Sequence, residues 1–175
     1  MPVTRLNHAV LYVRDVDRSV AFYSELLGFR TVMAFPGAAF LQAPGSTNDH
    51  DLGLFQIGDQ ARPSGAGQGT VGMYHLAWEV DTLDELERLA RVLADAGALV
   101  GASNHGTTKS LYAQDPDGLE MEICWLLPLD LITEDVLTAA RAAPVRPLDL
   151  RAEKERYGGQ TRGGIGVSVP AAAGE

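Results

Sequence analysis

Two histidines and one glutamate form a possible metal-binding set: His8, His75 and Glu122. His8 is the third residue of LNHAV (6–10) and His75 is the third residue of MYHLA (73–77), so both hold matching places in an internal repeat. Two histidines and one carboxylate leave one side of a metal open, which suits non-heme Fe(II), although Mn, Zn and Ni accept the same donors. Each residue alone is better explained by a core or surface role, but the matched places favour the metal site.

A turn determines what faces Glu122. Residues 116–118 read Pro-Asp-Gly, which favours a three-residue hairpin loop in which Gly118 takes a positive φ. Counting outward from this loop places Tyr112 opposite Glu122, so that a tyrosine and a carboxylate share one face of a sheet. The neighbours of Glu122 are mostly apolar, and a carboxylate on such a strand is costly unless a cation or hydrogen-bond donors compensate it.

Other polar side chains have two interpretations each. His50 suits general acid–base work, because imidazole titrates near neutral pH, but its two flanking aspartates also fit an exposed loop. Tyr112 would hydrogen-bond a substrate oxygen, or serve as a core aromatic. His105 lies in a Gly/Asn/Thr loop and is either a loop residue or a supporting group of the site. Lys109 is expected to be solvated, and Gln56 is the residue of the first half best able to become a fourth metal ligand.

The order of predicted elements repeats, which indicates an α+β protein. We expect two βαβββ modules that pair into one curved mixed sheet around a metal-containing cavity, with helices outside and His8 and His75 pointing inward. Leu52 and Leu54 are expected to line the cavity. The expected strands are 6–13, 30–35, 39–43, 50–57, 73–80, 99–102, 110–114 and 119–126, and the expected helices begin after Asp17 and Thr82 and end at Gly28 and Gly97.

Composition shifts suggest the domain boundaries. The two modules span about 4–57 and 73–127, within a domain of residues 1–128, and a linker rich in Gly, Ser and Pro joins them at 58–72. A C-terminal extension follows at 129–157, with helical patterns at 133–142 and 148–157. Residues 158–175 are rich in Gly and Ala and are predicted to be disordered.

The overall composition excludes several classes of function. The chain has 175 residues, 46% of them hydrophobic, and a net charge of −9 with a pI near 4.8, so no basic surface is expected for nucleic acid. The sequence shows no apolar run of membrane-spanning length and no apolar signal segment at its start. The single cysteine, Cys124, excludes an intrachain disulfide and a thiolate zinc cluster, and a cytoplasmic location is compatible with all of this.

The sequence resembles the vicinal oxygen chelate superfamily, which includes glyoxalases, bleomycin-resistance proteins and extradiol dioxygenases. LNHAV (6–10) and FYSELLGF (22–29) carry the general resemblance. The stretch from His105 to Glu122 is similar to the signature of single-domain type I extradiol ring-cleavage dioxygenases: a histidine, a spacer, an apolar-Tyr pair, an acidic-Pro-x-Gly turn and a ligand glutamate. The resemblance implies His8, His75 and Glu122 as Fe(II) ligands, with Mn(II) as an alternative.

The same resemblance assigns further roles. It implies Tyr112 as a partner of the bound catecholate, His50 as the acid–base residue and His105 as a supporting histidine. Two departures are Ser103, where the signature usually has another residue type, and a long spacing between His50 and His75. The implied activity is extradiol cleavage of a catechol-like substrate with O2, as in aromatic catabolism, by a homodimer or larger assembly.

Two other functions remain open at this level. A glyoxalase-like isomerase or a thiol transferase of the same fold would usually place a fourth protein ligand in the first half. A metal-free protein that binds and sequesters a drug would need neither the two histidines and glutamate nor Tyr112.

Overall fold

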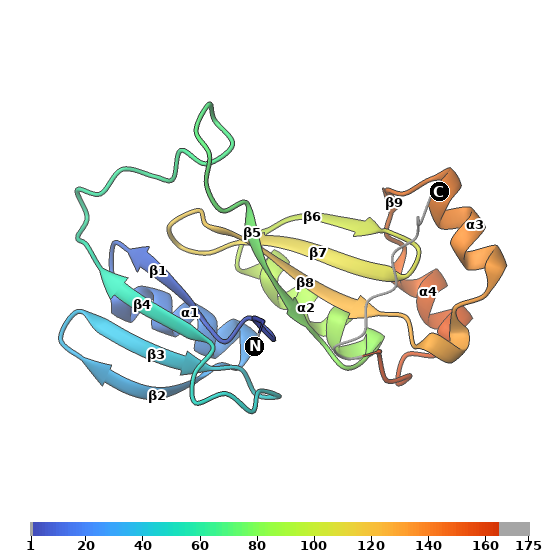
Figure 1. Cartoon of the computed structure of the whole chain (residues 1–175), viewed down its shortest axis with the longest axis horizontal. Helices are drawn as coiled ribbons and strands as arrows, with labels where there is room; N and C mark the ends of the chain where they lie inside the picture. Colours follow the sequence, from blue (N-terminus) through green and yellow to red (C-terminus); the bar gives the residue numbers. More distant parts are fainter. Residues whose placement is uncertain (1, 165–175) are drawn as a thin grey trace. The chain divides into compact units, whose positions relative to one another are not determined.

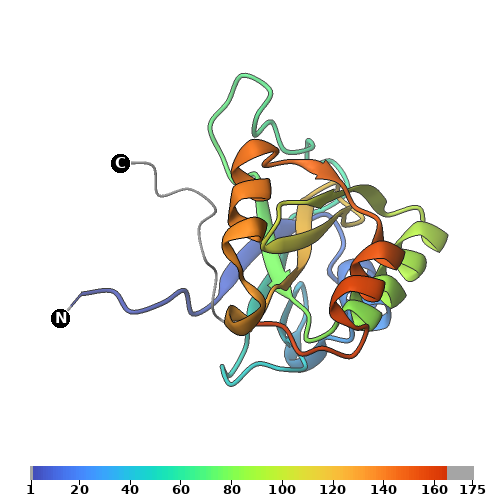
Figure 2. The ribbon, with the colours of Figure 1, turned by 90° about the vertical axis from the view of Figure 1, so that its right-hand side faces the viewer.

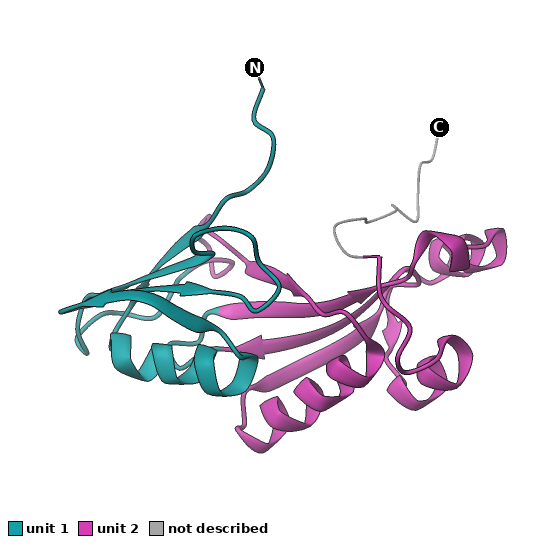
Figure 3. Ribbon diagram, turned by 90° about the horizontal axis from the view of Figure 1, so that it is seen from below, with its two compact units in different colours: residues 1–65, 115–119 teal, residues 66–114, 120–175 magenta. Residues whose placement is uncertain are grey.

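The computed structural model describes residues 2–164, and the chain divides into two compact units (Figure 3). Unit 1 comprises residues 1–65 with the loop 115–119, and unit 2 comprises residues 66–114 with 120–175. The division falls within the predicted linker, but one loop of the second module groups with the first unit. Each unit contains strands and a helix in the predicted order, which confirms the α+β class.

Unit 1 is a four-stranded sheet with one helix packed against it (Figure 1). The strands lie in the order β1-β4-β3-β2, in which β1 runs parallel to β4 and the other pairs are antiparallel. The elements are β1 (Ala9–Val13), α1 (Val16–Leu27), β2 (Arg30–Phe35), β3 (Ala38–Gln42) and β4 (Leu52–Gln56).

Local sequence signals explain the bounds of α1. The Asp15 side chain accepts a hydrogen bond from the Arg18 backbone N–H at 2.9 Å, which caps the helix two residues before the predicted Asp17. Gly28 ends the helix as predicted, at a φ of 77° that a side chain would disfavour.

Alternation along β1 separates a buried face from an exposed one. Leu11 and Val13 are 6% and 1% exposed, whereas Val10 and Tyr12 are 51% and 71% exposed. This pattern agrees with the predicted faces of the first strand.

The placement of Leu52 and Leu54 along a cavity is wrong. Both residues are fully buried, and they pair with Ala9 and Leu11 on the buried face of β1. The prediction counted alternation from His50, but β4 begins at Leu52 and His50 lies in the preceding loop. Because His50 is not part of the strand, its direction does not indicate which face Leu52 and Leu54 take.

Unit 2 is a five-stranded sheet in the order β5-β8-β7-β6-β9, with β5 parallel to β8 and the other pairs antiparallel. The predicted module is followed by three helices and a short strand of the C-terminal extension (Figure 2). The elements are β5 (His75–Glu79), α2 (Leu83–Asp95), β6 (Leu99–Asn104), β7 (Thr108–Gln114), β8 (Glu120–Leu126), the 3-10 helix η1 (Leu129–Leu131), α3 (Glu134–Ala142), β9 (Arg146–Pro147) and α4 (Leu150–Tyr157).

An aliphatic stripe attaches α2 to the sheet. The Thr82 hydroxyl accepts a hydrogen bond from the Glu85 backbone N–H at 3.2 Å, as expected for an N-cap. The buried residues of the helix recur at helical spacing and face β8, β7 and β6. These helix residues are Leu83, Leu86, Leu89 and Leu93.

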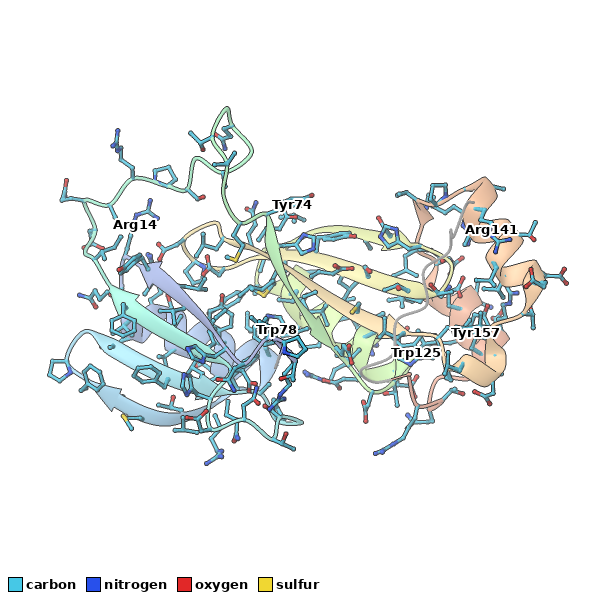
Figure 4. The ribbon with its side chains drawn as sticks, in the orientation of Figure 1. Arg14, Tyr74, Trp78, Trp125, Arg141 and Tyr157 are labelled. Carbon is cyan, nitrogen blue, oxygen red and sulfur yellow. The ribbon has the colours of Figure 1, made fainter. Side chains whose placement is uncertain are left out.

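The segment after α4 packs on unit 2. Backbone N–H groups of Gly163 and Gly164 donate to the carbonyls of Asp81 and Leu126 at 2.7 and 2.9 Å. Trp125 of β8 contacts Tyr157 at the end of α4, with ring centroids 6.1 Å apart (Figure 4). The prediction of disorder therefore does not hold for residues 158–164, and residues 165–175 lie outside the described part of the chain.

The hydrogen-bond ladders form two sheets, one in each unit, where the sequence predicted one sheet shared by both modules. The linker between β4 and β5 contains one isolated bridge, Ala66 with Thr70. Across residues 2–164, no helix is both long and apolar enough to cross a membrane.

Candidate active site

The hairpin between β7 and β8 has the predicted register. Tyr112 pairs with Glu122 across the antiparallel ladder. The Asp115 carbonyl accepts from the Gly118 N–H at 2.9 Å, and Gly118 has a φ of 80°. The local turn chemistry of Pro-Asp-Gly therefore sets which side chain stands beside the glutamate.

His75 and Glu122 form a close pair on the same face of the unit 2 sheet. His75 Nε2 lies 3.2 Å from Glu122 Oε2, and their side chains are 24% and 15% exposed. The other carboxylate oxygen of Glu122 accepts a hydrogen bond from the Ser110 hydroxyl. The predicted compensation of this carboxylate is therefore present as a histidine and a hydroxyl donor.

The same pair fits the demands of a divalent metal. Ligand atoms at about 2.1 Å from a metal and at right angles are about 3 Å apart, close to the separation of His75 Nε2 and Glu122 Oε2. His75 Nδ1 is buried and has no hydrogen-bond partner within residues 2–164, and Glu120 Oε1 lies 4.0 Å from it. A ligand histidine commonly directs its second ring nitrogen at a carboxylate, so this arrangement suits coordination through Nε2.

Tyr112 and His105 form a second pair in unit 2. The Tyr112 hydroxyl lies 2.9 Å from His105 Nε2, and His105 Nδ1 lies 3.0 Å from the carbonyl oxygen of Pro144. A carbonyl only accepts, so His105 Nδ1 carries the proton and donates it. In the neutral ring Nε2 is then an acceptor, and the Tyr112 hydroxyl donates to it.

Burial raises the pKa of the Tyr112 hydroxyl above its usual value, and the charge of Glu122 raises it further. Tyr112 is therefore a neutral phenol at physiological pH. Its proton is directed at His105, and Ser110 is a further hydrogen-bond neighbour of the hydroxyl, so one oxygen lone pair is left to accept from a substrate hydroxyl.

Unit 1 brings His8 and His50 together. Their ring centroids are 4.5 Å apart, and Phe40 contacts His50 at 5.0 Å between centroids. The Asn7 amide oxygen lies 2.7 Å from His8 Nδ1 and accepts its proton, which leaves Nε2 as the unprotonated nitrogen that a metal needs. His50 Nδ1 lies 3.2 Å from a carboxylate oxygen of Asp49, which suits an acid–base imidazole held by a carboxylate.

The predicted residues thus fall into two groups. His8 and His50 belong to unit 1, whereas His75, Tyr112, His105 and Glu122 belong to unit 2. Among residues 2–164, no group of three or more His, Cys, Asp or Glu side chains is gathered as a metal would require. The full three-ligand set therefore stays a prediction, supported by the geometry of each group separately.

The repeat shows what unit 1 offers in place of Glu122. Two residues after each matched histidine, Val10 pairs with Gly53 in unit 1 and Ala77 pairs with Glu122 in unit 2. The position equivalent to Glu122 is therefore Gly53, which has no side chain to bind a metal. A Cβ built on Gly53 would lie 3.3 Å from Val10.

Gln56 is engaged elsewhere, so the suggestion that it serves as a fourth ligand is not supported. Its side-chain oxygen accepts a hydrogen bond from the Val16 backbone N–H at 3.1 Å, at the start of α1. This contact could not be predicted from the sequence, because the two residues lie 40 positions apart.

Lys109 is the functional residue that the sequence misassigned. We expected it to be solvated, but it is 1% exposed and donates to the Asn104 side-chain oxygen at 2.9 Å and to the Gly106 carbonyl at 2.6 Å. Lys109, Ser110 and Leu111 are buried in succession along β7, so alternation along the strand gave no signal that this lysine is buried.

Comparison with known proteins gives the family. Residues 5–123 match the model of the Glyoxalase/Bleomycin resistance protein/Dioxygenase superfamily. The chain is 28% identical over 123 residues to a catechol-2,3-dioxygenase of Bacillus subtilis, and 33% identical over 130 residues to biphenyl-2,3-diol 1,2-dioxygenase 3 of Rhodococcus globerulus. These alignments cover 69% and 70% of this chain but only 41% and 64% of the two relatives.

Relatives with another activity match equally well. Glutathione transferase FosA of Serratia marcescens is 31% identical over 118 residues, which cover 67% of this chain and 78% of that protein. A solved glyoxalase/bleomycin resistance protein/dioxygenase domain from Frankia sp. has a TM-score of 0.56 at 23% identity, with 70% of this chain and 98% of that domain covered. That likeness supports the fold alone.

Proposed function

The chain belongs to the Glyoxalase/Bleomycin resistance protein/Dioxygenase superfamily, and we propose that it is a metal-dependent extradiol ring-cleavage dioxygenase acting on a catechol-like substrate with O2. The observation that carries the proposal is the group in unit 2, where the His75–Glu122 pair shares a strand face with Tyr112, and Tyr112 is hydrogen-bonded to His105. A ligand pair beside a phenol–imidazole pair suits a substrate that both binds a metal and loses a proton.

His75 and Glu122 are the ligands that the proposal draws from unit 2, and His8 of unit 1 is the third predicted ligand. Two histidines and one carboxylate suit Fe(II), and Mn(II) accepts the same donors. When bound, Fe(II) would supply the electron-transfer chemistry that lets O2 react with the electron-rich ring. Both oxygen atoms enter the product, the ring opens beside the diol, and a semialdehyde-type acid forms without an added reductant.

The side chains of this protein handle the protons. Tyr112, whose own hydroxyl points at His105 Nε2, would accept a hydrogen bond from a catechol hydroxyl through an oxygen lone pair. His50, held by Asp49, would take a proton from the second hydroxyl and return it during ring opening. Phe40 packs edge-to-face against the His50 ring.

Two features of unit 1 favour this proposal over a glyoxalase-like isomerase with a fourth protein ligand. Gly53 stands at the position equivalent to Glu122, and the oxygen of Gln56 caps α1. The same two features count against a thiol transferase with a fourth protein ligand, and that function would leave the Tyr112–His105 pair without a role.

The proposal is tested by oxygen uptake. Protein reconstituted with Fe(II) without air is mixed with a panel of catechols, and the His75→Ala variant is the control. We expect oxygen uptake with a yellow ring-opened product that the control does not form. Tight metal binding without uptake, together with transfer of glutathione to a test electrophile, would replace the proposal by the transferase. Protein that never binds metal would replace it by the drug-binding function.

One variant tests the acid–base role. His50→Phe keeps an aromatic ring against Phe40, so it should retain metal but lose most of its turnover number. Turnover near that of the unaltered protein would remove His50 from the acid–base role. A cytoplasmic location and a homo-oligomeric state remain predictions.

A further inference from the structure

The turn that carries His105 lies against the C-terminal extension. The extension follows residues 5–123, which match the family model. Gly106 has a φ of 86°, and a methyl group added there would overlap the Cβ of Ala140 on α3 and lie 3.3 Å from its Cα. Ala140 is fully buried. The close approach of α3 therefore depends on glycine at the residue after His105.

Further contacts from β9 and α4 hold the same turn. Arg146 of β9 pairs with Asn104, the residue before His105. Glu153 of α4 accepts from the Asn104 side-chain amide at 2.7 Å and lies 3.0 Å from Lys109 Nζ. Lys109 in turn donates to the Gly106 carbonyl, so both neighbours of His105 in sequence are tied to the extension or to this buried lysine.

One contact from the extension reaches the imidazole itself. The Pro144 carbonyl, between α3 and β9, accepts the proton of His105 Nδ1 at 3.0 Å. Which ring nitrogen of a histidine carries the proton is set by the hydrogen bond that the other nitrogen makes. With Nδ1 protonated, Nε2 is left to accept the Tyr112 hydroxyl proton at 2.9 Å.

We propose that the C-terminal extension is a positioning element of the active site, in which the Pro144 carbonyl holds His105 in the Nδ1–H form and thereby orients the Tyr112 hydroxyl. Pro144 and Ala140 act through His105 and are positioning residues, because neither contacts Tyr112. The consequence is that Tyr112 presents an oxygen lone pair, rather than its proton, to a substrate hydroxyl. The catalytic consequence rests on the proposed function, whereas the state of the His105 ring does not.

The direct test is the tautomer of His105 in the full-length, metal-free protein. Nitrogen-15 NMR of histidine-labelled protein distinguishes Nδ1–H from Nε2–H rings, and His105→Gln identifies the signal among the four histidines of the chain. We expect a neutral Nδ1–H ring for His105. An Nε2–H ring for His105 in the unaltered protein would overturn the inference.

Three variants then test whether the extension is responsible. Gly106→Ala should push α3 away and move His105 toward the Nε2–H form. Gly97→Ala is the matched control, because Gly97 has a φ of 68° in the same unit but no atom near its added methyl group, so it should leave the ring unchanged. Gly106→Ala with Ala140→Gly removes the overlapping methyl group and should restore the Nδ1–H ring.

The outcomes separate the two proposals. A folded Gly106→Ala protein that keeps the Nδ1–H ring would refute the role of the extension. If the tautomer behaves as expected but no catechol is cleaved, the positioning role stands and the dioxygenase proposal falls. If catechol is cleaved, Gly106→Ala should lower kcat, with recovery in the double variant and no loss in Gly97→Ala.

Discussion

The two units share one strand order but carry different side chains at equivalent positions. In each unit the first strand runs parallel to the fourth, and the third and second strands follow it in the sheet. At equivalent places on the fourth strand, unit 1 has Gly53 and unit 2 has Glu122. The repeated backbone therefore does not by itself supply a carboxylate at this position.

The outer strands differ as well. Every residue of β2 is exposed, so unit 1 leaves this edge strand open. In unit 2, β9 pairs with the corresponding strand β6, and the extension covers the turn that follows it. The unit with the carboxylate, Tyr112 and His105 is thus also the unit whose edge is covered, which suits the need of a reactive site for fixed side chains.

The largest effect is expected when the carboxylate that distinguishes the units is removed. Glu122→Gln should weaken Fe(II) binding at least about 100-fold and abolish oxygen uptake, because loss of even an outer-shell partner costs about 10–100-fold. Glu120→Gln, which alters the carboxylate 4.0 Å from His75 Nδ1, should have a smaller effect. Isothermal titration and metal analysis give the affinities.

Glu79→Gln is the matched control, with the same charge change on the neighbouring strand β5. Equal losses in the Glu79 and Glu122 variants would mean that net charge, rather than coordination by Glu122, governs metal binding.

The next effect tests the covered edge. Lys109→Met leaves Glu153 without its cation in a buried place, and we expect a loss of about 3 kcal/mol in the free energy of unfolding. Burial lowers the pKa of Lys109, and the charge of Glu153 opposes that shift. Urea unfolding followed by circular dichroism measures the change.

Arg151→Met provides the comparison on α4, because the Arg151–Glu155 pair is 88% and 66% exposed. Its effect should stay within about 0.5 kcal/mol. Similar losses in both variants would show that Lys109 does not hold the extension in place.

A smaller effect is expected from Asp115, which contacts helix α1. Tyr23 of α1 is 3.3 Å from a carboxylate oxygen of Asp115, whereas α2 is held by leucines. Burial raises the pKa of Asp115 above its ordinary value, which is near 4. Its contribution to stability is therefore complete below that value and is lost as the pH rises through the folded-state pKa.

The measured quantity is the difference in the free energy of unfolding between the unaltered protein and Asp115→Asn. This difference should fall as the pH is raised from acid toward neutral. A difference that rises with pH would contradict the assignment.

The smallest effect uses the only thiol, which lies in unit 2. Burial raises the pKa of Cys124 to about 12, with the charges of Glu122 and Glu79 as further causes. Cys124 should not react with iodoacetamide at pH 8 while unit 2 is folded. Labelling should therefore proceed only at the rate at which unit 2 opens. Fast labelling under native conditions would mean that this part of unit 2 is not closely packed.

Local chemistry made part of this structure predictable. The Pro-Asp-Gly loop specified the pairing of Tyr112 with Glu122, since a hairpin's register follows from its turn. The matched places of His8 and His75 identified the repeat. Capping by Thr82 and the stop at Gly28 were also visible, because those signals lie within four residues of the contacts they make.

The rest depended on contacts between distant residues. The burial of Lys109 depends on Glu153, 44 positions later in the chain. The role of Pro144 depends on its backbone carbonyl, a group that every residue has, so the residue type does not indicate it. The misplaced face of Leu52 came from reading His50 as part of the strand, whereas His50 lies in the loop before β4. Alternation predicts a face only from residues that belong to the strand.

The most direct measurement of the central claim is the stoichiometry of the reaction. Protein loaded with Fe(II) is given a limiting amount of the best catechol, and oxygen, ring-opened product and hydrogen peroxide are measured together. If the protein is an extradiol dioxygenase, we expect one O2 consumed for each ring opened, no peroxide, and no reaction in Glu122→Gln. Oxygen consumed with peroxide and an intact ring, or equal activity in Glu122→Gln, would contradict it.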